Sequence, residues 1–430
     1  MREMKDSGIA WVGSVPNNWR VMANKYLMRK IKVVKPAYED EDILSLTVNG
    51  VIVRDLEAGG KMPTSFDGYQ TLYPGNLLMC LFDYDVTPRC IGLIKNNGVT
   101  SPAYSQFVMK DGNIPDYYYY YYLMVDHTKA LLHLAKNLRH SFTEEQLGMI
   151  AAPVPPIKEQ QAIASYLDRR CEEIGAVTVD IQAQIDALEQ YKRSVITETV
   201  TKGMNPDTEM KDSGIQWIGQ MPAHWNCIRG KYILRYMQKP VKEDDGVITC
   251  FRDGEVTLRS KRREDGFTMS DKEIGYQGID VGDLVVHGMD GFAGAIGISD
   301  SRGKASPVLN ILGTDQNKRY IMYYLRSMAY SDVFLALATG IRVRSCDLRW
   351  NKLAELMYPV PPIEEQEKIV EHIDSVIKKT DEVIADKKEQ LETIEEYRNK
   401  RTRNPSHYCF LHWSSVFLIS ALCPESAASL

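Results

Sequence analysis

Two long stretches of the chain carry apolar residues at helical spacing. The first has Ile163, Leu167, Ile174, Ile181, Leu188 and Val195, and the second has Ile369, Ile373, Ile377, Ile384, Leu391 and Ile394. Steps of three and four that sum mostly to seven are typical of coiled-coil helices. The pattern therefore predicts long helices over residues 153–203 and 359–403, and about 44 helical residues of the first would form a rod of roughly 65 Å at 1.5 Å per residue.

Neither apolar stripe is stable in water on its own. The simplest arrangement packs the two helices on each other, antiparallel, as the centre of a molecule with pseudo-twofold symmetry. The alternative is that each helix packs only on its own neighbouring domain.

The remaining residues predict domains of the mixed α/β (α+β) class. Short apolar runs, such as residues 77–82 and 284–287, lie between turns rich in Gly, Asn and Asp. Residues 117–122 are six consecutive tyrosines. We interpret this run as an aromatic-rich helix or strand packed inside its domain, in preference to a surface that stacks on bases.

The chain repeats itself at a fixed offset of 206 residues. The block that starts at Met4 and ends at Trp19 recurs from Met210 to Trp225, and the Pro-Val-Pro-Pro-Ile block at 153–157 recurs at 359–363. Two separate blocks with one offset indicate a tandem duplication. Residues 20–152 and 226–358 align only in patches, so the pattern predicts two copies that do the same job on two different targets.

Composition is that of a soluble globular protein. The chain has 430 residues, of which 44% are hydrophobic and 25% charged. No apolar run approaches the roughly 20 residues that span a bilayer, and residues 1–8 lack the apolar core of a signal peptide. Eight thinly spread cysteines favour reduced thiols in the cytoplasm over disulfides or a zinc ribbon.

Charge is distributed unevenly along the chain, although the net charge is −5. Residues 226–358 carry 20 Lys and Arg against 17 Asp and Glu, and residues 20–152 carry 14 of each. Both helical stretches are acidic, with 6 basic against 8 acidic residues over 153–203 and 9 against 12 over 359–403. Any basic face is therefore expected on the variable domains.

Motifs for catalysis are missing. The two Pro-Pro pairs each follow a valine, which does not suit the Asn/Asp-Pro-Pro-aromatic loop of a DNA methyltransferase. The stretch from Gly297 to Lys304 does not fit a P-loop, and Pro206 to Lys211 resembles a nuclease motif only in one contiguous linker. The eight histidines show no metal-ligand spacing. We expect no metal site and no catalysis.

Together these motifs identify a family. The chain resembles the specificity subunit of type I restriction–modification systems over residues 1 to about 400. The resemblance rests on the Trp-x-Gly-x-x-Pro-x-x-Trp segments that end at Trp19 and Trp225, on the paired Pro-Val-Pro-Pro-Ile-x-Glu-Gln blocks, and on residues 340–350.

The resemblance implies a non-catalytic, DNA-binding chain. Target recognition domains at 1–152 and 204–358 would each read one half of a bipartite double-stranded DNA site. The helices at 153–203 and 359–403 would set the spacing and dock two modification (methyltransferase) subunits, which restriction (endonuclease) subunits join. S-adenosylmethionine, ATP and Mg would be bound by those partners, and this chain would need no cofactor.

Candidate DNA contacts are basic residues of the two variable domains. In the second domain they are Arg252, Lys261, Arg262, Arg263, Arg342 and Arg344, and in the first they are Lys95, Arg139 and His140. Arg139 aligns with Arg342, and for both the alternative is a structural pair with a carboxylate.

The C-terminal sequence departs from the repeat. After Tyr397, the counterpart of Tyr191, the heptad spacing and the family likeness both stop. This looks like a shifted reading frame, and we expect residues 404–430 to be a disordered tail that weakens helix pairing or assembly. A genuine variant terminus is the alternative.

Two other functions compete with DNA recognition. One is a coiled-coil scaffold that binds protein, and the other is a fused nuclease or methyltransferase.

Overall fold

The computed structural model describes residues 2–57, 63–135, 140–262, 274–337 and 348–399, and these form two compact units. The first unit comprises Met1–Asp180 with Glu389–Leu430, and the second comprises Ile181–Lys388. The unit boundary therefore falls inside both long helices, α4 (Ile157–Lys202) and α10 (Ile363–Asn399).

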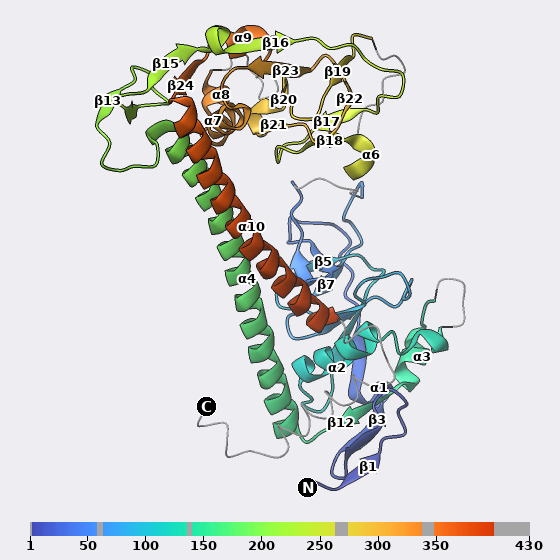
Figure 1. Cartoon of the computed structure of the whole chain (residues 1–430). Helices are drawn as coiled ribbons and strands as arrows, with labels where there is room; N and C mark the ends of the chain where they lie inside the picture. Colours follow the sequence, from blue (N-terminus) through green and yellow to red (C-terminus); the bar gives the residue numbers. More distant parts are fainter. Residues whose placement is uncertain (1, 58–62, 136–139, 263–273, 338–347, 400–430) are drawn as a thin grey trace. The chain divides into compact units, whose positions relative to one another are not determined.

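The first unit is built on a four-stranded antiparallel sheet in the order β4-β11-β8-β9. The first unit also contains short two-stranded sheets (Figure 1). The strands are β1 (Met4–Asp6), β2 (Ser14–Pro16), β3 (Arg20–Ala23), β4 (Met28–Ile31), β5 (Leu44–Thr47), β6 (Gly50–Val53), β7 (Gln70–Leu72), β8 (Leu77–Met79), β9 (Ile91–Leu93), β10 (Gly98–Thr100), β11 (Ser105–Met109) and β12 (Ala151–Val154). The helices before α4 are α1 (Asn24–Leu27), α2 (Pro115–His127), η1 (Leu132–Leu134) and α3 (Glu144–Met149).

The second unit repeats this plan with the sheet order β16-β23-β20-β21. Its strands are β13 (Met210–Asp212), β14 (Gln220–Pro222), β15 (Asn226–Arg229), β16 (Leu234–Met237), β17 (Ile248–Cys250), β18 (Val256–Leu258), β19 (Gln277–Ile279), β20 (Leu284–His287), β21 (Ile296–Ile298), β22 (Gly303–Ala305), β23 (Leu309–Thr314) and β24 (Met357–Val360). Its helices before α10 are α5 (Gly230–Ile233), α6 (Arg259–Arg262), η2 (Gly291–Ala293), α7 (Lys318–Tyr330), α8 (Val333–Ala336) and α9 (Trp350–Glu355). The mixed α/β class predicted from the sequence is thus present in both units.

One face of each sheet is covered by a tyrosine-rich helix. In the first unit this helix is α2, whose Tyr117, Tyr118, Tyr121 and Tyr122 are buried in one cluster with sheet residues. In the second unit α7 takes the same place on its sheet. Burial raises the pKa of the Tyr121 phenol above its ordinary value. The tyrosine run is therefore packed in the core, as the sequence analysis favoured.

The repeated sequence blocks meet at one joint in each unit. Strand β3 pairs with β12, and β15 pairs with β24, which brings the signature segment beside the Pro-Val-Pro-Pro segment. Trp19 Nε1 donates a hydrogen bond to Glu159 Oε2 at 2.8 Å. Likewise Trp225 Nε1 donates to Glu365 Oε1 at 3.1 Å.

A glutamine completes each joint. The Gln160 side chain accepts from the Ile114 N–H at 2.9 Å and donates to the Pro155 carbonyl at 2.9 Å. Gln366 makes the same two bonds, at 3.0 Å to the Asn317 N–H and 2.9 Å to the Pro361 carbonyl. Because both glutamines are fully buried, each unpaired amide group would carry a large desolvation cost. The joint therefore fixes where each long helix leaves its unit.

Both long helices start later than the sequence pattern predicted. The predicted starts were residues 153 and 359, but Pro153 and Pro359 lie in strands β12 and β24. The helices begin after the second proline of each pair, at Ile157 and Ile363. A proline has no N–H, so Pro156 and Pro362 suit the position just before the first helical turn, where an N–H would have no partner within the helix. Pro153 and Pro359 are tolerated in β12 and β24 because each of these strands lies in a two-stranded sheet. The described part of α10 ends at Asn399, and the predicted tail at 404–430 lies outside the described residues.

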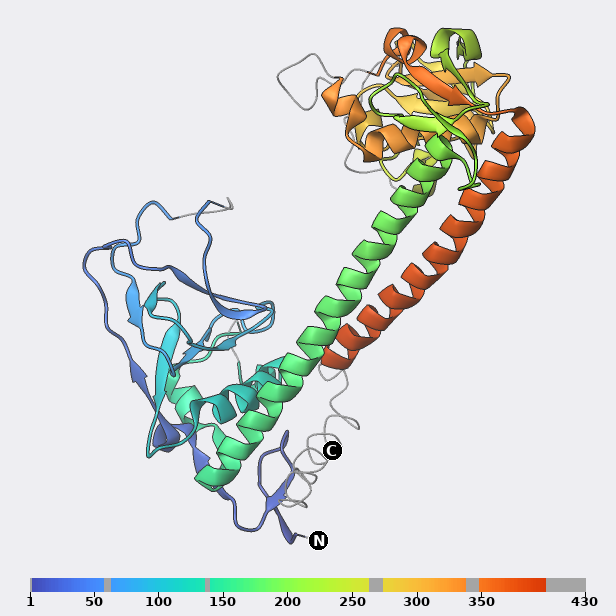
Figure 2. The same cartoon turned by 90° about the vertical axis from the view of Figure 1, so that its left-hand side faces the viewer.

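Within the second unit the two long helices lie side by side (Figures 1 and 2). Lys192 Nζ lies 2.5 Å from Asp381 Oδ1, and Lys387 donates to Gln184 Oε1. The later α4 residue, Lys192, contacts the earlier α10 residue, Asp381, and the earlier Gln184 contacts the later Lys387. The two helices therefore run antiparallel. Ile196 and Val200 of α4 and Ile369 and Ile373 of α10 are buried in one core cluster with α7. The helices thus pack on each other and on the second unit's domain.

Candidate nucleic-acid interface

The structure describes five of the nine predicted DNA contacts. They are Lys95 and His140 in the first unit and Arg252, Lys261 and Arg262 in the second. The other four, Arg139, Arg263, Arg342 and Arg344, lie outside the described residues.

Arg262 is held by its own unit. Its guanidinium lies 2.6 Å from Asp253 Oδ2 and 2.8 Å from Glu255 Oε2. The same group lies 4.1 Å from the centre of the Phe251 ring. The hydrogen bond to Asp253 raises the pKa of Arg262. With two carboxylates and a ring against it, Arg262 fastens α6 to the turn between β17 and β18.

Arg252 and Lys261 are more loosely held. Arg252 makes one ion pair, 2.9 Å to Asp290, and its side chain is 67% exposed. Lys261 donates to Ser301 Oγ at 2.7 Å, lies 3.5 Å from Asp300 and is 53% exposed. Exposed single ion pairs contribute little to stability, so either cation can exchange its carboxylate for a phosphate at small cost. These two side chains are the better candidates for DNA contact.

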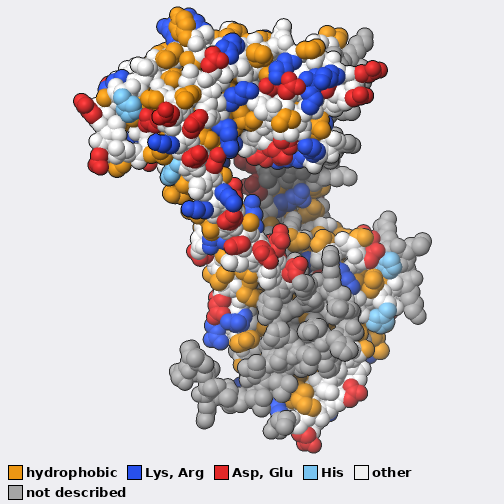
Figure 3. Space-filling model, viewed as in Figure 1, with side chains coloured by type: hydrophobic (Ala, Val, Ile, Leu, Met, Phe, Trp, Pro, Cys, Tyr) orange, Lys and Arg blue, Asp and Glu red, His pale blue; other side chains and the backbone are white. Residues whose placement is uncertain are grey.

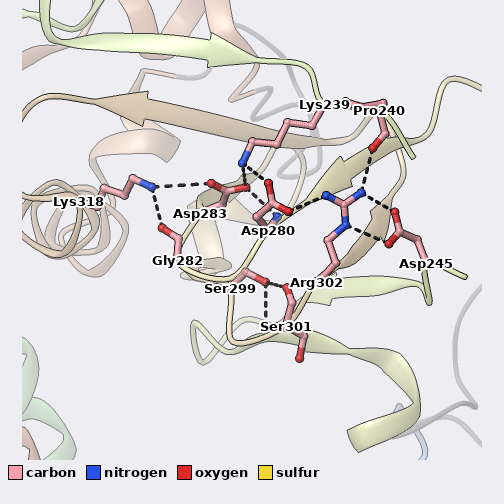
Figure 4. Close-up of polar contacts among 10 residues, drawn as sticks. All are labelled: Lys239, Pro240, Asp245, Asp280, Gly282, Asp283, Ser299, Ser301, Arg302 and Lys318. Carbon is pink, nitrogen blue, oxygen red and sulfur yellow. Dashed lines mark hydrogen bonds and ion pairs between the residues drawn. The ribbon is translucent and has the colours of Figure 1, made fainter. Parts of the chain in front are cut away.

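A charge network that the sequence analysis missed is centred on Arg302 in the second unit (Figure 4). Arg302 contacts Asp245 at 2.8 Å and Asp280 at 2.6 Å, and it donates to the Pro240 carbonyl at 2.9 Å. Lys239 lies 2.8 Å from Asp280 and 2.6 Å from Asp283. The hydrogen bond from Arg302 lowers the pKa of Asp245 to about 2.

The network fixes the segment between β16 and β17. Lys318 adds a hydrogen bond of 2.8 Å to the Gly282 carbonyl and lies 3.7 Å from Asp283. Ser299 donates to the Ser301 carbonyl at 2.8 Å on the turn that carries Arg302. Three cations face three carboxylates here, so the cluster has no surplus charge for phosphate. We assign it a structural role, that of holding the segment between β16 and β17 against the turns that carry Asp280, Asp283 and Arg302.

The first unit presents its candidates differently. Lys95 is exposed in the loop between β9 and β10. His140 is half-buried, and its Nδ1 lies 2.9 Å from Asp85 Oδ2. Lys95 is therefore the more accessible of the two.

No single basic face stands out on the surface shown in Figure 3. Lys and Arg side chains over the second unit are interspersed with Asp and Glu (Figure 3). Across the described part of the chain, no group of three or more His, Cys, Asp or Glu is arranged to hold a metal ion. None of the described helices is long and apolar enough to cross a membrane.

Sequence reasoning gave no role to the joint residues Glu159, Gln160, Glu365 and Gln366. Their shared offset of 206 residues was a signal that could have identified them.

Comparison with known proteins points to one family. The model of the type I restriction modification DNA specificity domain matches residues 90–187. A putative type I restriction enzyme MjaX specificity subunit from Methanocaldococcus jannaschii is 24% identical over 274 residues, which are 60% of this chain and 59% of the relative. The chain thus spans about three-fifths of that curated relative.

One solved structure has a TM-score above 0.5 and shares the fold. A chain from a study of complex assembly and conformational transition of the type I R-M system has a TM-score of 0.59 at 13% identity, covering 90% of this chain and 97% of that one. The HsdS subunit from Thermoanaerobacter tengcongensis matches with a TM-score of 0.47 at 14% identity, covering 91% and 98%. Residues 90–187 thus match the type I restriction modification DNA specificity domain, and the chain as a whole is similar to specificity subunits of that family.

Proposed function

We propose that this chain is the sequence-specific DNA-binding subunit of a type I restriction–modification complex. The observation that carries the proposal is the duplicated joint: one framework of Trp–Glu and glutamine bonds recurs in two units whose remaining sequences differ. A common framework that carries two different variable domains suits two domains that each recognise a different half-site. The family match supplies the nature of the target, which is DNA.

The proposed division of labour follows the sequence boundaries. Residues 1–152 and 204–358 are the two recognition domains, and α4 and α10 are antiparallel spacers that relate them by pseudo-twofold symmetry. A helix of 46 residues, the length of α4, spans about 70 Å at 1.5 Å per residue. That length can hold two readers one helical turn of DNA or more apart.

Partners are proposed from the charge distribution and the family. The helical stretches are acidic and the recognition domains are neutral or slightly basic, which favours protein docking on the helices and DNA on the domains. Two modification subunits would dock there, with restriction subunits joining them. Methyl transfer and cleavage, with S-adenosylmethionine, ATP and Mg, belong to those partners, and this chain is non-catalytic.

The DNA contacts are proposed in an order of preference that the geometry supports. Arg252, Lys261 and Lys95 come first, because each is exposed and makes at most one ion pair among the described residues. Arg262 and His140 come second. Arg139, Arg263, Arg342 and Arg344 stay on the list from the sequence alone.

Mapping methylated bases in the host genome tests the proposal. We expect a bipartite motif that disappears when the gene is deleted. Replacing residues 226–358 with the variable region of another specificity subunit should change one half of the motif and leave the other half intact. A methylation pattern that does not respond to deletion, together with purified chain that does not shift duplex DNA at low salt, would exclude the proposal.

A further inference from the structure

One exposed motif occurs at the same place in both units. The sequence Lys-Tyr-x-x-Arg is found at residues 25–29 and again at 231–235, which keeps the offset of 206. In each unit it runs from a short helix, α1 or α5, into an edge strand of the four-stranded sheet, β4 or β16. The variable domains match only in patches, so the recurrence of this motif needs a physical reason.

Packing accounts only for the positions between the tyrosine and the arginine. Leu27 and Met28 are buried in the first unit, and Leu234 is buried in the second. In contrast, Tyr26 is 57% exposed and Tyr232 is 74% exposed. The lysine and the arginine of the motif are exposed in both units as well. Exposed side chains contribute little to the stability of a fold, so stability does not require these three residue types twice.

The lysine and the tyrosine have the same geometry in the two units. Lys25 Nζ lies 5.1 Å from the centre of the Tyr26 ring, and Lys231 Nζ lies 5.5 Å from the centre of the Tyr232 ring. Both distances are within the range of a cation–π contact. Neither phenol hydroxyl has a hydrogen-bond partner among the residues that the structure describes. Each unit therefore presents an ammonium group and an available hydroxyl side by side.

The first unit leaves its two cations without an acidic partner. Lys25 Nζ contacts an uncharged group, the Met149 sulfur, at 3.5 Å. Within the described part of the chain, neither Lys25 nor Arg29 forms an ion pair. Lys110 adds a third ammonium group, which donates to the Lys25 carbonyl at 2.7 Å. This surface is basic, and it suits an anion.

The second unit pairs the same cations with exposed carboxylates. Lys231 Nζ lies 3.1 Å from Glu355 Oε1, and Arg235 lies 2.7 Å from Asp315 Oδ1. Glu355 is the counterpart of Met149 at the offset of 206. All four of these side chains in the second unit are more than a third exposed. Because ion pairs this exposed are weak, a phosphate can displace either carboxylate at small cost.

Duplex DNA offers one surface that is the same at two different half-sites. Under the proposed function the two units read different bases, whereas the phosphodiester backbone does not change with sequence. Residues shared by two unlike readers therefore suit backbone contact, and residues that differ suit base contact. Lysine, arginine and tyrosine side chains all donate hydrogen bonds to phosphate oxygens.

We propose that the repeated motif binds the phosphates of duplex DNA, with one such phosphate site in each unit. The two sites comprise Lys25, Tyr26, Arg29, Lys231, Tyr232 and Arg235. They rest on the proposed function and extend it, because they hold the duplex in place without any preference for its sequence.

Titrations of duplex DNA at several salt concentrations test the sites on the full chain. The double variant Lys25→Ala, Arg29→Ala should reduce the slope of log affinity against log salt concentration by about 2, since two phosphate contacts are lost. Binding should weaken by the same factor on a duplex with the methylated motif and on one of random sequence. Lys158→Ala is the control and should leave the slope unchanged, because this exposed lysine of α4 has Glu364 as its counterpart.

The second unit gives a variant with the opposite effect. Glu355→Gln with Asp315→Asn removes the carboxylates that neutralise Lys231 and Arg235. DNA binding at low salt should then tighten about threefold, and the salt slope should become steeper. A gain in affinity cannot come from a misfolded chain, so this variant keeps the test decisive if the alanine variants prove unstable.

Mapping methylated bases in the host genome distinguishes these sites from base readout. Because phosphates carry no sequence information, the variants should leave both halves of the motif unchanged. A change in either half, or salt slopes equal to the wild type in all variants, would overturn the phosphate sites and leave the proposed function intact. In the second case, the shared surface would instead contact a protein present in two copies. Wild-type chain that fails to shift duplex DNA would overturn both proposals.

Discussion

At the residue scale, single polar groups decide which contacts are structural. Arg262 and Arg302 each engage two carboxylates, whereas Arg252 engages one. The cost of breaking such a contact rises when both partners lose water, because a carboxylate left buried without its partner is poorly solvated. Arginines of one domain therefore have different roles, depending on how many carboxylates each of them contacts.

Asp245 gives a prediction about acid stability. The hydrogen bond from Arg302 lowers its pKa to about 2, below the roughly 3.9 of an Asp in an unfolded chain. A lowered folded pKa stabilises the protein above the unfolded pKa, and this contribution is lost as the pH falls from about 4 towards 2. Urea midpoints of the wild type should thus fall more steeply over this window than those of Asp245→Asn. Parallel pH curves for the two proteins would argue against a linked Arg302–Asp245 pair.

Tyr320 gives a second prediction at this scale. Tyr320→Phe should lower the free energy of unfolding by about 1–3 kcal/mol, because it leaves the Val200 and Pro359 carbonyls without their donor. Tyr117→Phe is the matched control, since it removes a buried hydroxyl that makes no bond to any residue the structure describes, and it should be neutral or stabilising. Urea unfolding of both variants measures the difference, and a larger loss for Tyr117→Phe would show that its hydroxyl has a partner.

At the element scale, the ends of the long helices carry the specific information. Each begins after a proline pair, is fixed by a buried glutamine, and in α4 ends at a left-handed glycine. The helix interiors need only an apolar stripe on one face. Sequence at the ends is thus more constrained than sequence in the middle.

Gly175, inside α4, and Gly203, directly after its last residue, test this difference. Gly203→Ala should destabilise the second unit by about 1 kcal/mol or more, because an alanine must adopt a φ of +75° with its Cβ 3.3 Å from Trp225. Gly175→Ala should stabilise the helix by about 0.5–1 kcal/mol, since a Cβ there meets no atom within 4 Å. Thermal unfolding of the two variants in opposite directions is the expected result. A shift of the same sign for both would contradict the cap.

Some features of these elements could be predicted from the sequence and others could not. The helices were predictable, because Ile181, Ile373 and Ile384 keep their period over many turns and are buried in the structure. The Arg302–Asp245 pair was not, because its members are 57 positions apart and share no pattern. The start of α4 was placed four residues early, since the sequence does not show that Pro153 pairs in a strand with Val21. Arg262 was found by its basic neighbours, but only the structure reveals its carboxylates.

At the scale of the whole molecule, the proposed DNA contacts predict a salt dependence. The slope of log affinity against log salt concentration reports how many phosphates the protein neutralises, with about 0.9 per contact. Arg252→Ala and Lys261→Ala should each weaken binding across sequences and reduce that slope by about 1. Arg342→Ala is expected to act in the same way.

Arg262→Ala is the contrasting variant for this series. Because Arg262 is occupied by Asp253 and Glu255, its loss should lower stability more than it changes the salt slope. Titrations of duplex DNA at several salt concentrations supply the slopes. Unchanged slopes for both Arg252→Ala and Lys261→Ala would remove this face of the second unit from the DNA interface.

The equal bonds made by Gln160 and Gln366 have a consequence for how such genes can change. A crossover in the stretch that encodes Pro-Val-Pro-Pro-Ile-x-Glu-Gln would splice one reader onto the other copy's helix and keep every bond of the junction. New pairings of half-sites can then arise by recombination between matching stretches of gene, with no new contact surface to evolve at the seam.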